Sequence, residues 1–338
     1  MKRKKVIISV LMIGIIVLVF LINNRTPFFT PKKGGWSIGY SFYDSLPSKL
    51  KVNKNHIFSI DKMMKINDST VFLADPFFIT AKDTIYIFFE YQMKKSGADI
   101  AVMKSVDGFN FKYDTIVLDE SFHLSYPNVF KYKTEYYMLP ETKSSNNVLL
   151  YKAHNFPYDW RISDTLIKNV RLKDPSIYLS DSLNFLVASD DNLNLYMYES
   201  DSLFGKWEKK KRKSLVSVGS ESRPAGRIFL DENKKITLPL QNCTQGYGYG
   251  VSLYNLDFDN NGSYEFNLSK KFFLEAQDNI MEFSGGMHHI DVQKYNSQYY
   301  IVYDGNHLKE NDIKVFNWIF PFKVTYLDTK NYIYQLFN

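Results

Sequence analysis

The sequence predicts an all-β fold: a five-bladed β-propeller preceded by one N-terminal transmembrane helix. The prediction starts from a segment, Val71 to Glu90, that holds an Ala-Asp-Pro-Phe start, an apolar strand, a polar turn and a second strand. Altered copies of this segment begin at Tyr126, Asp174, Arg223 and His289. A strand-built repeat of about 50 residues is typical of propellers, because each unit is one small sheet that buries its faces against its neighbours.

The composition suits a β-rich domain and argues against a nucleic-acid partner. The 338 residues are 45% hydrophobic and 17% aromatic, which fits half-buried strands and sugar-facing clefts. The net charge is +6, and the densest basic run, Lys209 to Lys213, falls between two predicted strands. Nucleic-acid binders usually carry a broader basic face, so this run favours a solvated hairpin over a polyanion site.

Residues 1–24 predict a signal anchor. Basic residues precede an uncharged run from Val6 to Ile22, which as a helix is about 25 Å long, near the minimum that spans a bilayer. The alternative is a signal peptide that is removed, but no small-residue cleavage site follows the run. We therefore expect a single-pass protein that enters the membrane through residues 6–22. Its short basic N-terminus would stay in the cytoplasm and the propeller would lie on the exported side, periplasmic or extracellular in a bacterium.

The remaining chain divides into a linker, residues 25–35, and a propeller, residues 36–338. Each unit continues with a hairpin, and an aromatic residue follows its turn: Phe109 or Phe111, Trp160 and Trp207. This recurrence predicts four strands per blade, with the last blade ending in the segment 313–327. We expect residues 36–60 to close the ring against the last blade. The single Cys243 allows no internal disulfide, so packing must hold the fold together.

Carboxylates recur at the start of the blades. The first strand of each propeller blade lines the central channel, so Asp75, Asp174 and Glu221 should converge although about fifty residues separate them. Gathered carboxyls push their pKa values apart, and glycoside hydrolysis needs one ionised and one protonated carboxyl. The alternative is that each Asp-Pro pair only caps a turn. The repetition in register favours a functional role.

Other polar residues near the blade starts are predicted to bind substrate, because arginine and histidine at a channel mouth suit sugar hydroxyls, a carboxylated sugar or a phosphate. No cofactor is expected, since the chain has no dinucleotide fingerprint or phosphate-binding glycine loop. No metal is expected either, since the histidines lack the helical spacing of a zinc motif. The glycine-rich stretch 246–250 is interpreted as a bent strand or loop. The predicted substrate-binding residues are His123, Tyr126, Arg223, Arg227, Gln241, His288, His289 and Asp291.

Several ordered motifs carry a family resemblance: ADPF from residue 74, HLSYPNVF from 123, LYKAHNFPYDW from 150, KDPSI from 173 and SRPAGR from 222. Together they resemble the amino-terminal domain of plant glucosamine inositolphosphorylceramide transferases over about residues 36–325. That domain is similar to the five-bladed propellers of glycoside hydrolase family 43. The resemblance implies Asp75 as base, Asp174 as the residue that tunes pKa and orients substrate, and Glu221 as acid. Ser-Arg-Pro follows Glu221 where the hydrolases commonly have Gly-Pro, so Glu141 is the second candidate acid.

Two functional hypotheses follow. The first is a membrane-anchored, glycan-active enzyme, an inverting glycosidase or a related glycosyl-transferring protein, acting on a glycan or glycolipid. The second is a non-catalytic carbohydrate-binding module that assists a separate glycosyltransferase or a polysaccharide assembly system. A scaffold without sugar affinity comes third, because polar channel positions favour a small hydrophilic ligand.

Overall fold

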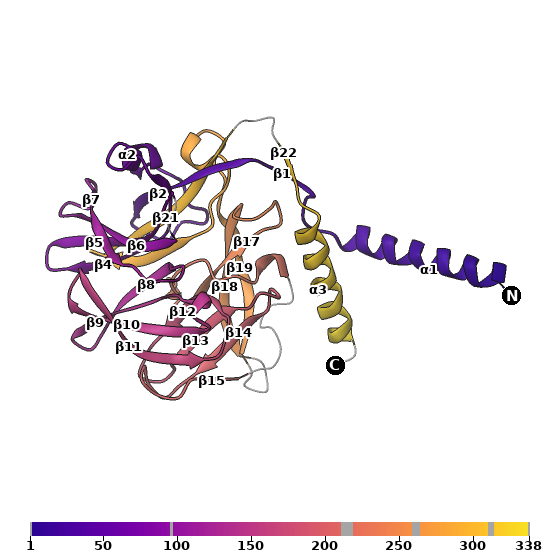
Figure 1. The fold of residues 1–338 in the computed structure, drawn as a ribbon. Coiled ribbons are helices and arrows are strands. Elements are labelled where there is room, and N and C mark those ends of the chain that lie inside the picture. The colour runs from indigo at the N-terminus through magenta and orange to yellow at the C-terminus, as the bar shows by residue number, and fades with distance from the viewer. Residues whose placement is uncertain (1, 95–96, 211–218, 259–263, 310–313, 337–338) are drawn as a thin grey trace.

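The computed structural model describes residues 2–94, 97–210, 219–258, 264–309 and 314–336, and it confirms the predicted fold class. Five four-stranded antiparallel sheets stand around a central axis, and one apolar helix leaves the ring at the N-terminus (Figure 1). Helix α1 (Lys2–Asn23) has the length and composition of a membrane-spanning helix, and its side chains are exposed along the apolar run. The part of the chain predicted to be an anchor is therefore helical and unburied.

Each blade is a meander of neighbouring strands whose first member lies innermost. The first blade runs through β4 (Thr70–Ala81), β5 (Thr84–Met93), β6 (Ala98–Ser105) and β7 (Lys112–Leu118). The second runs through β8 (Ser125–Tyr132), β9 (Glu135–Glu141), β10 (Asn147–Asn155) and β11 (Asp159–Lys168). The third runs through β12 (Lys173–Tyr178), β13 (Phe185–Ser189), β14 (Leu195–Glu199) and β15 (Glu208–Lys209).

The last two blades differ in how they are completed. The fourth runs through β16 (Phe229–Leu230), β17 (Ile236–Asn242), β18 (Gly250–Phe258) and β19 (Tyr264–Glu275). The fifth takes β20 (Ile290–Tyr295) and β21 (Gln298–Leu308) from the end of the chain, then β2 (Lys33–Tyr43) and β3 (Ile57–Phe58) from its start. The short helix α2 (Ile60–Met64) and the 3₁₀ turns η1 (Lys143–Ser145), η2 (Gly219–Glu221) and η3 (Met281–Phe283) connect these strands.

The ring is closed by the N-terminal segment, as predicted. Strand β2 pairs with β21 in antiparallel register, with Ile38 opposite Asp304 and Tyr40 opposite Val302. Strand β3 then adds the outer edge by pairing Phe58 with Ile38. The two ends of the domain thus share one sheet, so the ring cannot open without breaking strand pairing.

Two boundary predictions were wrong. The C-terminal segment expected to end the fifth blade instead forms strand β22 (Lys314–Phe316) and helix α3 (Ile319–Leu336). Because β2 and β3 already complete the fifth blade, this segment has no place in the propeller sheets. The expected linker also contains structure, since strand β1 (Phe29–Pro31) pairs with β22, and β2 begins at Lys33.

The hydrophobic core is divided among the five interfaces between blades. Adjacent residues of β4 show how: Phe77 packs with Val129 and Met138 of the second blade, whereas Phe78 packs with Tyr300 of the fifth. Successive side chains of a strand point to opposite faces, so each sheet feeds two interfaces. This explains the continuous apolar runs seen in the sequence.

The predicted aromatic residues after the hairpin turns lie in these interfaces. Phe111, Trp160 and Trp207 are all buried, and the two tryptophans donate their indole N–H to the carbonyl oxygens of Pro157 and Leu203. Of the basic run Lys209 to Lys213, Lys209 ends β15 and Lys210 pairs with Glu199 at 2.8 Å. Residues 211–213 lie outside the described part of the chain.

Candidate active site

The innermost strands of the first three blades share an unusual backbone conformation. Asp75, Tyr126 and Asp174, each followed by proline, have φ angles of 52°, 52° and 51°. Register shifts in β4, β8 and β12 surround these residues. A non-glycine residue in this region costs about 1–3 kcal/mol and persists only where its surroundings hold it, typically at functional sites. The sequence repeat therefore marks a repeated, strained bend at one level of the channel.

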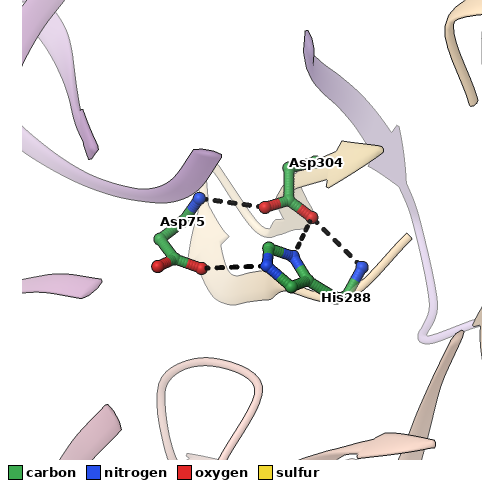
Figure 2. A group of neighbouring side chains, drawn as sticks. All are labelled: Asp75, His288 and Asp304. Atoms are coloured by element: carbon green, nitrogen blue, oxygen red, sulfur yellow. Dashed lines mark hydrogen bonds and ion pairs between the residues drawn. The ribbon is translucent and has the colours of Figure 1, made fainter. Parts of the chain in front are cut away.

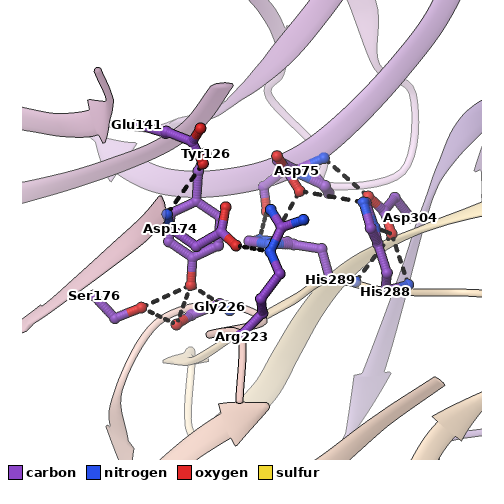
Figure 3. Close-up of polar contacts among 11 residues, drawn as sticks. Asp75, Tyr126, Glu141, Asp174, Ser176, Arg223, Gly226, His288, His289 and Asp304 are labelled. Atoms are coloured by element: carbon purple, nitrogen blue, oxygen red, sulfur yellow. Dashed lines mark hydrogen bonds and ion pairs between the residues drawn. The ribbon is translucent and has the colours of Figure 1, made fainter. Parts of the chain in front are cut away.

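Arg223 joins the second, third and fourth blades at this level (Figure 3). Its Nε lies 2.6 Å from Oδ2 of Asp174, and Oε2 of Glu141 accepts a hydrogen bond from the Asp174 backbone N–H at 3.2 Å. Burial would raise the pKa of Asp174, but the adjacent guanidinium outweighs burial and lowers it. Burial, together with the charge of Asp174, raises the pKa of Glu141 to about 8. Two neighbouring carboxyls are thus held in opposite protonation states near neutral pH.

Asp75 faces an Asp–His pair from the fifth blade (Figure 2). Nε2 of His288 lies 3.8 Å from Oδ1 of Asp75, and Nδ1 of the same ring lies 2.8 Å from Oδ1 of Asp304. Burial raises the pKa of Asp75 to about 7, while the charge of His288 opposes the rise. Burial alone would lower the pKa of His288, but Asp304 and Asp75 outweigh it and raise it. The raised pKa favours the protonated form of the His288 ring, which lies beside Asp75.

Asp75, His288 and Asp304 also form a group whose ligand atoms lie within 4.8 Å of one another, a spacing that suits a metal ion. The hydrogen bonds argue for another role. Oδ1 of Asp304 accepts from the backbone N–H groups of His288 and His289 at 3.1 and 3.0 Å, and Oδ2 accepts from the Asp75 N–H at 2.9 Å. Because Asp304 uses its oxygens within the protein, we interpret the group as a hydrogen-bonded relay.

Glu90 and His123 lie where the site approaches solvent. Nε2 of His123 is 3.3 Å from Oε1 of Glu90, and the histidine side chain is 43% exposed against 8% for the glutamate. Burial, followed by the charge of Asp75, raises the pKa of Glu90 well above its usual value. Glu90 is opposite Ala74 in β4, directly before Asp75. It therefore belongs to the same group as Asp75.

His289 and Trp36 complete the wall on the side of the fifth blade. Nδ1 of His289 lies 3.6 Å from Oδ1 of Asp75, and its Nε2 lies 3.1 Å from the Pro76 carbonyl oxygen. Burial lowers the pKa of His289 to about 3, so this ring is neutral. The Trp36 ring stacks on His288 with 3.9 Å between centroids. The two predicted histidines thus differ, because the pKa of His288 is raised whereas that of His289 is lowered.

Glu221 and Gln241 are the first of the predicted site residues that lie apart from this group. Glu221 accepts hydrogen bonds from Asn242 Nδ2 at 2.9 Å and from the Tyr254 hydroxyl. Burial raises its pKa, but within the described residues no hydrogen bond or ion pair joins it to Asp75, Glu141 or Asp174. Gln241 is buried in β17, its N–H donates to the Arg223 carbonyl oxygen at 2.8 Å, and its side-chain oxygen has no hydrogen-bond partner.

Tyr126 joins three blades below the site. Its hydroxyl accepts from the Gly226 N–H at 2.6 Å and also contacts Ser176 Oγ at 2.7 Å and the Gly226 carbonyl oxygen at 2.9 Å (Figure 3). Gly226 itself has φ of 144°, and a Cβ there would lie 1.6 Å from the Ile290 carbonyl oxygen. Only glycine fits this close approach of two blades. The hydroxyl predicted to bind substrate is thus used inside the protein.

Arg227 and Asp291 form a second connection across the channel. Nε of Arg227 lies 2.7 Å from Oδ1 of Asp291, and its NH2 group donates to the carbonyl oxygens of Phe78 and Val129. Oδ2 of Asp291 accepts from the Phe78 N–H at 2.8 Å. The pair bonds four blades to one another. The polar atoms of Arg227 and Asp291 are thus used in hydrogen bonds that hold the blades together.

Two members of the site, Glu90 and Asp304, are not among the predicted catalytic or substrate-binding residues. Glu90 lies on the second strand of the first blade opposite Ala74, directly before Asp75, as Glu141 lies on the second strand of the second blade opposite Ser125, directly before Tyr126. That shared position was a usable signal. Asp304 holds the same position in the fifth blade, because it lies on the second strand, β21, and its N–H donates to the carbonyl oxygen of His289 at 3.3 Å. The repeat copy that begins at His289 runs to Tyr303-Asp304-Gly305, so the same signal was available for Asp304.

The assembled group has the parts for acid–base chemistry on a polar ligand. It holds one carboxyl with a pKa near neutrality, one that stays protonated above neutral pH and one that stays ionised, with a guanidinium between blades. Such a set can take a proton from a nucleophile and give one to a leaving oxygen. The predicted residues that the structure brings together here are Asp75, His123, Glu141, Asp174, Arg223, His288 and His289.

Comparison with known proteins gives one family. The model described as "Glucosamine inositolphosphorylceramide transferase 1, N-terminal" matches residues 31–306. Glucosamine inositolphosphorylceramide transferase 1 of Oryza sativa subsp. japonica is 34% identical over 265 residues, which cover 71% of this chain and 34% of the rice protein. Its counterpart in Arabidopsis thaliana is 30% identical over 312 residues, which cover 83% and 40% respectively. The matched region thus spans less than half of either plant relative.

Solved structures show the same fold at low identity. An α-L-arabinofuranosidase from Podospora anserina, crystallised with cellotriose, superposes with a TM-score of 0.52 at 13% identity and covers 82% of this chain and 99% of its own. A glycoside hydrolase family 43 protein from Bacillus licheniformis gives a TM-score of 0.50 at 15% identity, covering 72% and 57%. At these identities the likeness concerns the fold alone.

Proposed function

The chain belongs to the family of the N-terminal domain of glucosamine inositolphosphorylceramide transferase 1, and from this premise we propose that it is a membrane-anchored, glycan-active enzyme. The plant relatives are named as transferases of a glycolipid, which supports a glycan or glycolipid as substrate. The observation that carries the proposal is the opposed pKa shifts of Glu141 and Asp174 beside Asp75. Enzymes that break or form glycosidic bonds usually use two carboxyls whose pKa values are shifted in opposite directions.

In the proposed reaction Asp75 is the general base and Glu141 the general acid. With a pKa of about 7, Asp75 can remove the proton from water or from an acceptor hydroxyl as that oxygen attacks the anomeric carbon. With a pKa of about 8, Glu141 is protonated at neutral pH and can donate to the oxygen of the departing group. Attack and departure on opposite faces invert the configuration, which requires the two carboxyls to be roughly 6.5–9.5 Å apart.

Asp174 and Arg223 are proposed to orient the substrate and set the acid. Burial and, after it, the ionised Asp174 keep Glu141 protonated, because a buried carboxylate is poorly solvated and two adjacent carboxylates repel each other. Arg223 has 22% of its side chain exposed while it holds Asp174, so part of the guanidinium is free to bind sugar hydroxyls or an anionic group. We assign the role of acid to Glu141 and not to Glu221, because the carboxyl of Glu221 is hydrogen-bonded to Asn242 and Tyr254.

A binding role without turnover is the second candidate. It is favoured by the fact that the chain matches only 34–40% of the length of the plant relatives, which leaves the activity of the whole plant protein unassigned to this region. In that case the site would hold a glycan for a separate glycosyltransferase. Such a partner, like the membrane orientation with the propeller on the exported side, is part of the proposal.

The deciding experiment compares the purified full chain with Asp75→Asn on a glycan array and on a panel of aryl glycosides and glycosyl donors. Turnover by the wild type that is lost in Asp75→Asn, with glycan binding retained, supports the enzyme. Equal glycan binding by both proteins, with turnover by neither, supports the binding module. A matched control is Asp107→Asn, which changes an exposed hairpin carboxylate whose partners are its own turn residues.

A further inference from the structure

Helix α3 has apolar residues on two faces. One face is packed on the propeller: Val324 and Leu327 are buried, and Oδ1 of Asp328 accepts from the Gly219 N–H at 2.6 Å. This face anchors the helix to η2, which ends two residues before Arg223 of the site. The opposite face is exposed along most of its length, and within the described residues it meets Phe20 and Phe28 only at Phe322.

That exposed face continues onto the neighbouring strands. Ile319, Phe322, Tyr326 and Ile333 follow one another at helical spacing and form one stripe along α3. We call the stripe and its flanking exposed residues on β1 and β22 the aromatic collar. Its members, with their exposed fractions, are Phe29 57%, Phe316 57%, Trp318 55%, Ile319 62%, Phe322 48%, Tyr326 66% and Ile333 49%.

Helix α1 emerges from this collar. The ring of Phe20, in the last turn of α1, stacks on Phe322 with centroids 4.2 Å apart, and the Thr325 hydroxyl lies 3.3 Å from Oδ1 of Asn24. Figure 1 shows α1 pointing away from the propeller while α3 runs across its direction. Helix α1, which has the composition of a membrane span, is thus in direct contact with the aromatic collar.

This contact fixes the depth of the collar if α1 lies in a bilayer. Phe20 is three residues from the end of α1 at Asn23, which is about 4–5 Å along the helix axis. An aromatic ring stacked on Phe20 is therefore held near the boundary between acyl chains and headgroups. From this geometry we propose that the aromatic collar docks on the surface of the lipid bilayer, with α3 lying in the interface.

The side chains of the collar match that environment. Tryptophan, tyrosine and phenylalanine concentrate at membrane interfaces, where one end of the ring is apolar and the other wet. Lys330 of α3 is exposed, whereas Asp328, its acidic residue, is buried against Gly219. Lys314 beside the collar is also exposed. Exposed cations around an apolar stripe favour the lipid surface over a water-filled interface.

The collar lies at the same end of the propeller as the candidate site. Lys323 of α3 donates to the carbonyl oxygen of Asp191, in the turn between β13 and β14. Oδ1 of Asp191 lies 2.9 Å from Nζ of Lys173, the residue directly before Asp174. Docking would therefore turn the channel mouth toward the headgroups. A membrane-borne glycan as the ligand of that mouth rests in addition on the proposed function.

Spin labelling of the full chain in phosphatidylcholine–phosphatidylglycerol nanodiscs tests the docking. The only cysteine, Cys243, is buried and is replaced by alanine, and single labels are placed at Tyr326→Cys, Leu11→Cys and Val106→Cys. Leu11 reports whether α1 is in the bilayer, and Val106, 77% exposed on a hairpin of the first blade, is the aqueous control. The readout is the ratio of collisions with oxygen, which dissolves in lipid, to collisions with a water-soluble nickel chelate.

We expect the oxygen-to-nickel collision ratio of the label at position 326 to be higher than that of the label at position 106. It should approach the ratio of the label at position 11. A ratio at 326 equal to that at 106, with 11 in lipid, overturns the docking and leaves the anchor intact. Strong dipolar coupling between labels at 326 on two copies would instead assign the collar to a dimer and also overturn it. None of these readouts uses a glycan, so failure of the proposed enzyme activity is detected separately.

A second measurement covers the case in which the Cys243→Ala background does not fold. The native chain is placed in nanodiscs whose lipids carry bromine near the headgroup, which quenches nearby tryptophan fluorescence. Trp160 and Trp207 are buried in the propeller and Trp36 is half-buried against His288, whereas Trp318 is 55% exposed, so Trp318 should supply most of the quenching. Trp318→Phe should remove that part of the quenching, and unchanged quenching in this variant contradicts docking of the collar.

Discussion

The carboxyl of Glu141 and the backbone N–H of Asp174 are joined by a hydrogen bond of 3.2 Å that crosses from the second blade to the third. The bond places two carboxyls side by side, and Arg223 then decides which of them ionises, because its guanidinium contacts Asp174. Glu141 of the second blade thus keeps its proton partly because Asp174 of the third blade is ionised. The predictions below follow from this arrangement and from its counterpart around Asp75.

Glu141→Gln and Glu221→Gln should have unequal effects. Loss of the proposed acid removes proton donation to the leaving group, so Glu141→Gln should lower the turnover rate by about 10²–10⁴-fold. Glu221 is bonded to Asn242 and Tyr254, so Glu221→Gln should change turnover by less than about tenfold. Steady-state rates of the two variants on the same substrate decide the matter. The reverse order of losses would restore Glu221 as the acid.

The rate should depend on pH with a bell-shaped profile. Turnover rises as Asp75 loses its proton, at a pKa of about 7, and falls as Glu141 loses its own, at about 8. The maximum is therefore expected between these values. In Glu141→Gln the residual activity should keep the acidic limb and lose the alkaline one. A profile whose alkaline limb survives that substitution would mean that another group supplies the proton.

His288→Gln should move the acidic limb to higher pH. The charged imidazole stabilises ionised Asp75 and so lowers the pKa of that carboxyl against the effect of burial. Without the charge, the pKa of Asp75 rises, and activity appears only at more alkaline pH. The shift in the acidic limb is the measurement, and a His289→Gln variant is the control, because burial keeps that ring neutral. Equal shifts in both variants would contradict a role for charge.

Tyr126→Phe should destabilise the propeller. The hydroxyl is bonded to Ser176 and to both backbone groups of Gly226, and all of these are buried. Leaving them without a partner should cost about 1–3 kcal/mol of unfolding free energy, measured by denaturant titration. Tyr158→Phe, which changes an exposed hydroxyl on a hairpin, is the comparison. A loss no larger than that of Tyr158→Phe would show that the blades do not depend on this connection.

The sequence by itself determined the number of blades, the N-terminal helix and the positions that face the channel. These features follow from local patterns, because strand alternation and the Asp-Pro bends at Asp75 and Asp174 are written within single repeats. Ring closure by residues 36–60 could also be inferred, since a propeller needs a partner for its last sheet. The prediction that the C-terminal segment ends the fifth blade was wrong. Strands β2 and β3 occupy that position in the sheet, and the C-terminal segment forms a helix instead.

Only the tertiary structure decided which carboxyls meet. Glu221 lies two residues before the blade start at Arg223, yet η2 turns it toward Tyr254, while Asp304 reaches Asp75 from the second strand of the fifth blade. Side-chain direction at these positions depends on bends, register shifts and packing between blades that no single repeat encodes. Burial and neighbouring charge, which set the pKa values of Asp75 and Glu141, exist only once the five blades close around them.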